Sequence, residues 1–264
     1  MNKKLCGETT IHYADEGQGD KVIVLLHGFC GSSSYWDDVI PLLSPHYRCI
    51  VPDLRGHGQS DAPKGAYSME DMADDVLKLL EELGIPKVVL LGHSMGGYIA
   101  LSAVQRHPER FSAFGLIHST AHADTEEAKE KRLKAVSTIE TAGITAFVDG
   151  LVPGLFAPQH LDSMADKVNK TRGIGYTTPP QGAAGAALAM RGRPDRRDVL
   201  TAAPLPVLLV AGENDQVIPI ERTFTADQPN IQRSIISGAG HMSMMEAPQE
   251  LAEVMKGFLE GFVE

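Results

Sequence analysis

Cysteine is scarce in this sequence, and its placement excludes some kinds of structure. Only Cys6, Cys30 and Cys49 occur among 264 residues, an odd number with neither a CxxC pair nor other metal-ligand spacing. Such a set offers no disulfide framework and no thiolate metal site, and it is typical of a reducing compartment. We expect three buried structural thiols in a cytoplasmic protein.

Blocks of like charge and long apolar runs are also missing. Lys and Arg number 24 against 34 Asp and Glu, a net charge of -10, but the acids are spread over several segments. Residues 1–6 are followed by Gly7-Glu8-Thr9-Thr10 rather than an apolar run, and no later stretch is expected to reach membrane-spanning length. We therefore expect neither a nucleic-acid nor a membrane partner, while the oligomeric state stays open.

Short apolar runs, in contrast, recur along the chain. A run that is apolar at every position is typical of a parallel strand buried on both faces of a sheet. Helical patterns separate most of these runs, and the clearest helix lies between Ser68 and Gly84, both good capping residues. The alternation predicts a doubly wound parallel sheet of the α/β class. The runs are residues 22–26, 49–51, 88–91, 114–117 and 207–210.

The strand rhythm stops after residue 120. Four helical stretches are predicted instead, near residues 124–141, 144–151, 161–169 and 182–190. A long helical insertion between two strands predicts a cap over the sheet, and because no low-complexity linker flanks it, we expect the cap to be fixed in place. The predicted domains are therefore a core formed by residues 1–120 and 199–264 and a cap formed by residues 121–198.

One glycine-flanked serine is the first candidate for chemistry. Ser94 lies in Gly92-His93-Ser94-Met95-Gly96-Gly97, directly after a predicted strand and at the start of a helical run. A serine raised above a sheet sits on a strained strand-to-helix turn, in which side chains two residues before and after it would collide. Gly92 and Gly96 meet that requirement. We therefore predict that Ser94 is an exposed nucleophile.

A serine nucleophile needs a base, and ten histidines compete for that role. We predict His241, because it follows a strand-like segment and precedes the last helix, an arrangement that brings it to the carboxyl edge of the sheet with Ser94. The other candidates have structural explanations. Those in tight turns are His27, His57 and His93, and those expected at the surface or at helix ends are His12, His46, His107 and His160.

The acid that orients the base is expected just beyond the strand at 207–210. Asp215 lies there, and it satisfies the chain order of nucleophile, acid and histidine. Glu213 is a nearby rival that is better placed to serve the turn. Asp124 is a weaker rival, better placed to cap the first cap helix.

The oxyanion of a tetrahedral intermediate requires two backbone donors. The N–H of Met95, directly after the nucleophile, is the first. The turn His27-Gly28-Phe29-Cys30-Gly31 follows an apolar strand, and its glycines let amides face the site. We predict the N–H of Phe29 as the second donor.

Together these motifs resemble the α/β-hydrolase superfamily over nearly the whole chain outside the cap. The resemblance implies an eight-stranded, mostly parallel sheet with the site at its carboxyl edge. It implies a triad at Ser94, Asp215 and His241 and oxyanion donors at Phe29 and Met95. No metal ion or organic cofactor is implied. The motifs are His27-Gly28-Phe29, Asp53 to Ser60, the turn around Ser94, Gly212 to Asp215 and Gly240-His241.

The resemblance leaves the reaction partly open. Dehalogenases and epoxide hydrolases of the superfamily use an aspartate where Ser94 stands, so we expect a serine hydrolase that cleaves a small carboxylic ester or lactone through an acyl-enzyme. The run Gly28 to Ser33 also resembles the menaquinone-pathway synthase, a lyase with the same triad. A ligand-binding protein without turnover is the third alternative.

Substrate choice is assigned to the cap. Apolar residues there and methionines beside His241 predict an adaptable pocket wall, and five cap arginines could bind a carboxylate or form a solvated face. His118 and His122 make a poor metal pair because no third ligand is placed, and we expect one of them to line the pocket. The wall residues are Leu151, Val152, Leu155, Phe156, Met242, Met244 and Met245, and the arginines are Arg172, Arg191, Arg193, Arg196 and Arg197.

Overall fold

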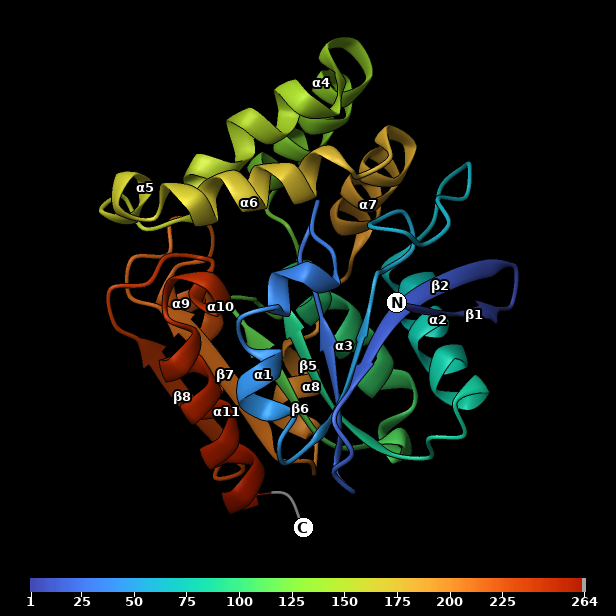
Figure 1. Ribbon diagram of the computed structural model, residues 1–264, viewed down its shortest axis with the longest axis vertical. Helices are drawn as coiled ribbons and strands as arrows, with labels where there is room; N and C mark the ends of the chain where they lie inside the picture. The colour runs from blue at the N-terminus through green and yellow to red at the C-terminus, as the bar shows by residue number, and fades with distance from the viewer. Residues whose placement is uncertain (263–264) are drawn as a thin grey trace.

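An eight-stranded sheet organises the chain. The computed structural model describes residues 1–262. The strands are β1 (Asn2–Cys6), β2 (Thr9–Glu16), β3 (Val22–Leu26), β4 (Arg48–Pro52), β5 (Val88–His93), β6 (Phe111–Ile117), β7 (Val207–Gly212) and β8 (Ile231–Ile236). They lie in the order β1-β2-β4-β3-β5-β6-β7-β8, with β2 antiparallel to both neighbours and every other pair parallel (Figure 1). The predicted mostly parallel sheet of eight strands is confirmed.

Helices cover both faces of this sheet. They are α1 (Ile40–Leu43), α2 (Met69–Glu82), α3 (Met95–Arg106), α8 (Arg197–Ala202), α9 (Ile220–Thr223), α10 (Ser243–Glu246) and α11 (Pro248–Phe262). Because successive strand residues point to opposite faces, Val24 and Leu26 of β3 pack with α2 and α3, whereas Ile23 and Leu25 pack with α1 and α11. The central strand β3 is therefore apolar at every position.

Two details of the sequence prediction concern single residues. Ser68 and Asp71 form a capping box at the start of α2, and Gly84 follows the end of this helix at φ +65°. The three cysteines are free and buried, as expected. Burial raises the pKa of the Cys49 thiol to about 12, which makes it unreactive at neutral pH.

The strand β1 is missing from the sequence prediction. It pairs with β2 through a turn in which Gly7 has φ +69°, and it forms the edge of the sheet. Its lysines, Lys3 and Lys4, face outward or lie half-buried. Charged residues on an edge strand discourage pairing with a second chain, so this strand lacks the apolar run by which the others are recognised.

Four of the five α-helices between β6 and β7 form a layer at the carboxyl ends of the strands (Figure 1). They are α4 (Glu126–Leu151), α5 (His160–Ser163), α6 (Ala165–Tyr176) and α7 (Pro180–Gly192). The first contains two of the predicted helices, which meet at Gly143 with φ +86°. Ion pairs join α6 to the core at Lys167–Asp38 (2.5 Å) and Lys170–Asp37 (2.8 Å). The domain boundaries at residues 121 and 198 stay a prediction.

One stretch is longer and more apolar than the sequence analysis expected. Glu126–Leu155, which comprises α4 and the turn η3 (Val152–Leu155), has the length and composition of a membrane span, and 17% of its most apolar window is buried. This corrects the expectation that no run approaches that length. The stretch packs against α6 and α7 in the cap layer. Core helices of soluble proteins and signal sequences can have the same length and apolar composition. These two properties alone therefore identify no membrane partner.

Candidate active site

Ser94 lies at the sharp turn between β5 and α3. Its backbone has φ +51° and ψ -113°, which is strained for any residue with a side chain. A Cβ atom on Gly92 would lie 2.2 Å from the carbonyl oxygen of Gly96, and one on Gly96 would lie 2.7 Å from that of Leu26. Close backbone approach therefore requires both glycines. The turn leaves Ser94 partly exposed among buried neighbours.

His241 approaches Ser94 from the loop that follows β8. Both residues line the same cavity. The Nδ1 atom of His241 donates a hydrogen bond of 2.8 Å to Oδ2 of Asp215, and the two side chains are 2% and 0% exposed. The structure thus brings together the three residues that the sequence predicts as nucleophile, base and acid.

Asp215 is fixed by several donors. Its Oδ1 accepts hydrogen bonds from the backbone N–H groups of Val217 (2.8 Å) and Ile218 (3.0 Å). Its Oδ2 also lies 3.3 Å from Nδ1 of His118. Burial alone would raise the pKa of the Asp215 carboxyl, but the charge of His241 and hydrogen bonds from His118 and His241 outweigh it and hold that pKa well below its usual range. Asp215 therefore faces His241 as an anion at neutral pH.

His118 is a second imidazole on this carboxylate, and the sequence analysis did not assign it that place. It is fully buried at φ +48°, and its Nε2 lies 2.6 Å from Oγ of Ser243. Burial lowers the pKa of His118, so the ring is neutral and accepts from the Ser243 hydroxyl while Nδ1 faces Asp215. Neither His118 nor His122 is among the residues that line the cavity, contrary to expectation.

The sequence analysis considered His118 and His122 as a metal pair, but metal-ligand spacing occurs at a different set of residues. His122 lies 3.9 Å from Asp195 rather than with His118. Within residues 1–262, the ligand atoms of His118, Asp215 and His241 lie within 4.8 Å of one another. In that group Nδ1 of His241 and Oδ2 of Asp215 are already joined by a hydrogen bond of 2.8 Å.

The two rival acids have other partners. Glu213 accepts hydrogen bonds from Oγ of Ser237 (3.0 Å) and from the N–H of Gly238 (2.7 Å), so it serves the turn after β8. Asp124 pairs with Arg132 and Arg193 at the base of the cap. Neither has a hydrogen bond to His241 in the part of the chain that the structure describes.

Glu246 holds the loop that carries His241, and the sequence analysis missed it. Its fully buried carboxylate accepts from the N–H groups of Gly240 (3.0 Å) and Met242 (3.1 Å), on either side of the histidine. It also accepts from the N–H of Ala157 (2.9 Å) and from Nδ1 of His160 (2.7 Å) in the cap segment. His160 was expected at the surface, but its side chain is 20% exposed. The only signal for Glu246 is an acid within a methionine-rich run.

The two predicted oxyanion donors lie in turns next to Ser94. Phe29 precedes Cys30, whose φ is +53°, and the turn closes with a hydrogen bond of 3.1 Å from the Gly31 N–H to the Gly28 carbonyl. Met95 is the first residue of α3, where backbone N–H groups have no partner within the helix. Neither N–H has an acceptor among residues 1–262, so both can donate to a ligand.

Comparisons with known proteins agree with this architecture. The family model described as alpha/beta hydrolase fold matches residues 21–142. A thermophilic esterase from Thermogutta terrifontis superposes with a TM-score of 0.92 and 33% identity, covering 97% of this chain and 94% of that one. The chain belongs to the α/β-hydrolase family. The family's named relatives also make it a hydrolase enzyme.

Two further relatives illustrate the range of this family. The enol-lactonase from Burkholderia xenovorans LB400 superposes with a TM-score of 0.90 and 26% identity, covering 98% of this chain and all of that one. A Bacillus subtilis protein provisionally named 2-succinyl-6-hydroxy-2,4-cyclohexadiene-1-carboxylate synthase is 30% identical, with 93% of each chain covered. The fold is thus shared by proteins with different named reactions.

The cavity of this α/β-hydrolase is small. Its volume is about 60 Å³, which favours a short substrate. Of the predicted wall residues, Leu151 and Leu155 line it, whereas the other five do not. The lining residues are Phe29, Tyr35, His93, Ser94, Tyr98, Arg132, Leu151, Leu155, Met190, Val217 and His241.

For the five cap arginines, the sequence left both carboxylate binding and a solvated face open. None of the five predicted candidates lines the cavity, and Arg132 of α4 does. Arg193 and Arg196 are buried in ion pairs with Asp124 and Glu70. Arg172 pairs with Asp149, and Arg197 pairs with Asp195.

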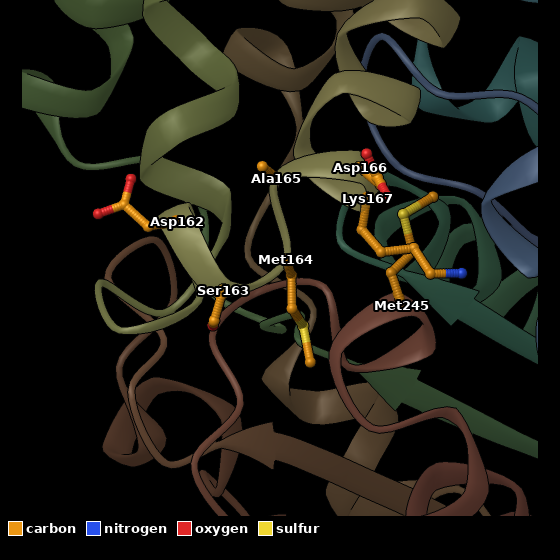
Figure 2. A pocket seen from close by; sticks show the side chains of 7 residues that line it. All are labelled: Asp162, Ser163, Met164, Ala165, Asp166, Lys167 and Met245. Carbon is orange, nitrogen blue, oxygen red and sulfur yellow. The ribbon is translucent and has the colours of Figure 1, made fainter.

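A second, larger cavity of about 410 Å³ lies between the cap and α10 (Figure 2). It contains a serine, Ser163, but no histidine is among the lining residues that the structure describes. The Ser163 hydroxyl donates instead to the carbonyl oxygen of Gln159 at 2.9 Å. This cavity therefore lacks the base that an activated serine requires. Its lining residues are Asp162, Ser163, Met164, Ala165, Asp166, Lys167 and Met245.

The stability of this hydrolase should depend on pH through four buried histidines. Burial lowers the pKa of His27 to about 4 and that of His57 to about 3, and it also lowers those of His93 and His118. Because the unfolded chain binds these protons first, the stabilisation is complete above about pH 6.5 and is lost as the pH falls. For His27 and His57, we expect the free energy of unfolding to fall by up to about 1.4 kcal/mol per pH unit for each histidine between pH 6.5 and 4.

Urea unfolding at several pH values tests this expectation. His57→Gln should reduce the slope of stability against pH by the share of one histidine, whereas His46→Gln, at an exposed position, should leave it unchanged. Equal unfolding midpoints at pH 7 and pH 5 would contradict the prediction.

Proposed function

We propose that this enzyme hydrolyses a small carboxylic ester or lactone through an acyl-enzyme on Ser94. The observation that carries the proposal is the hydrogen bond between His241 and an ionised Asp215 beside the cavity that Ser94 lines. The esterase and enol-lactonase relatives support the substrate class. No cofactor takes part in this proposal, and buried free thiols support a cytoplasmic site of action.

The proposed reaction has two halves. His241 takes the proton of the Ser94 hydroxyl as the oxygen attacks the substrate carbonyl, and Asp215 stabilises the imidazolium that forms. The N–H groups of Phe29 and Met95 stabilise the oxyanion. His241 then gives its proton to the leaving alkoxide, and in the second half it activates the water that hydrolyses the acyl-enzyme.

A second candidate is a lyase that uses the same residues. The synthase-like relative at 30% identity favours it. In that case His241 would act as a base in proton abstraction, and no acyl group would be attached to Ser94. The acyl-enzyme is therefore the species that distinguishes the two candidates.

Rapid mixing of the enzyme with p-nitrophenyl acetate tests for this species. We expect a burst of nitrophenol equal to the number of active sites. If deacylation is the faster step, added methanol should divert the product to methyl acetate. Efficient turnover of the substrate of that synthase, with neither a nitrophenol burst nor formation of methyl acetate, would reverse the assignment in favour of the lyase.

A further inference from the structure

Arg132 places a permanent positive charge in the cavity of Ser94. It extends from the first half of α4, and its side chain is 26% exposed. The other residues that line the cavity are apolar, hydroxyl-bearing or histidine. Within the described part of the chain, Arg132 is thus the one lining residue with a fixed charge.

This charge is not neutralised locally. The buried carboxylate of Asp124 forms ion pairs with Nε of Arg132 (3.1 Å) and with Nη1 of Arg193 (2.7 Å). Two guanidinium groups therefore share one anion. Arg193 also donates from Nη1 to the carbonyl oxygen of Met190 (2.8 Å) and from Nη2 to that of His122 (3.2 Å). The excess positive charge therefore resides beside the cavity.

Arg132 also has donors to spare. Only its Nε has an acceptor among residues 1–262, which leaves both terminal nitrogens to bind a ligand. Two parallel N–H groups match the two oxygens of a carboxylate, in a geometry that lysine cannot reproduce. One excess positive charge balances one carboxylate, whereas a phosphate monoester would bring about two negative charges.

We propose that Arg132 binds a carboxylate of the substrate, so that this enzyme prefers short esters or lactones that carry a second, free carboxylate. The inference rests on the proposed hydrolysis at Ser94. The small cavity favours a short substrate of this kind. Asp124 acts as a positioning residue, because its carboxylate holds Nε of Arg132 and is itself held by Arg193.

Matched methyl esters test the proposal. Monomethyl succinate and methyl isocaproate have the same shape, but a carboxylate replaces an isopropyl group. We expect the wild-type enzyme to have a kcat/KM at least about tenfold higher for monomethyl succinate, measured by methanol release. Arg132→Gln should lower kcat/KM for that ester by about 10- to 100-fold, mainly through KM, and should change the value for methyl isocaproate by less than about threefold.

Three controls keep the test sharp. Arg172→Gln removes a cap arginine that donates to Asn169 outside the cavity. It should leave kcat/KM unchanged for both esters. Arg132→Lys keeps the charge without the paired donors and should retain part of the preference. In both Arg132 variants, Asp124 still has its ion pair with Arg193. Labelling of Ser94 by a fluorophosphonate checks that the site is folded.

The outcomes separate this inference from the proposed function. Turnover of both esters without preference, or equal losses on both in Arg132→Gln, overturns the carboxylate site alone. A wild-type enzyme that neither hydrolyses esters nor reacts with the fluorophosphonate overturns the proposed function as well.

Discussion

Ser94→Ala is expected to abolish ester turnover and fluorophosphonate labelling while leaving the fold intact. Without the hydroxyl no acyl-enzyme can form, and loss of a triad nucleophile typically lowers turnover by about 10⁶-fold. Alanine keeps a Cβ atom, so the backbone strain at φ +51° is the same in both proteins. Since the hydroxyl is partly exposed, the thermal midpoint should shift by no more than about 2 °C.

Ser163→Ala is the matched control for this prediction. Ser163 lines the larger cavity (Figure 2), and no histidine is among the lining residues that the structure describes. The control variant should keep full labelling and full turnover. Labelling that persists in Ser94→Ala, or that disappears in Ser163→Ala, would show that the nucleophile is another serine.

The centre of the sheet could be predicted from the sequence because burial on both faces leaves an unambiguous mark. Ile23 to Leu26 are all fully buried, and their side chains alternate between the two core layers. The edge strand β1 has no such mark, since solvent replaces one neighbouring strand and polar residues are tolerated there. The cap helices were predicted by position, including the two helical pieces of α4 that meet at the non-helical Gly143.

The site divides in the same way between local and distant information. Ser94 is identified by glycines within two residues of it, and Asp215 and His241 by the strands that precede them. Arg132 belongs to the charged run Glu126 to Lys134, which is typical of a solvated helix face. Only the packing of the cap over the sheet shows that this arginine faces the cavity.

His118 and Glu246 were missed for a related reason. Each acts on a partner about 90 or more residues away, since Oδ2 of Asp215 and the N–H of Ala157 lie on other elements of the fold. A buried histidine and a buried glutamate leave no periodic pattern in a sequence. Their roles follow from hydrogen-bond partners that only the folded chain provides.

Asp215→Asn is expected to lower turnover by about three to four orders of magnitude. Oδ1 of Asp215 accepts two backbone N–H groups, so the asparagine oxygen should take that place and its NH₂ group should face His241. The NH₂ group of the asparagine and the Nδ1–H of His241 are both donors and cannot form a hydrogen bond with each other. Nδ1 of His241 must therefore give up its proton to accept from the NH₂ group. The proton moves to Nε2, the atom that has to accept the proton of Ser94, and the charge that stabilises the imidazolium is lost as well.

Steady-state kinetics on methyl isocaproate, a neutral ester, measure this effect without involving the carboxylate site. Asp124→Asn is the control, because Asp124 is also a buried, ion-paired aspartate but contacts Arg132 and Arg193 rather than His241. It should cost less than about tenfold, since the loss of its charge alters neither the tautomer of His241 nor the charge beside it. A larger loss in Asp124→Asn than in Asp215→Asn would mean that the orienting acid is misassigned, because only the true partner of His241 controls which ring nitrogen carries the proton.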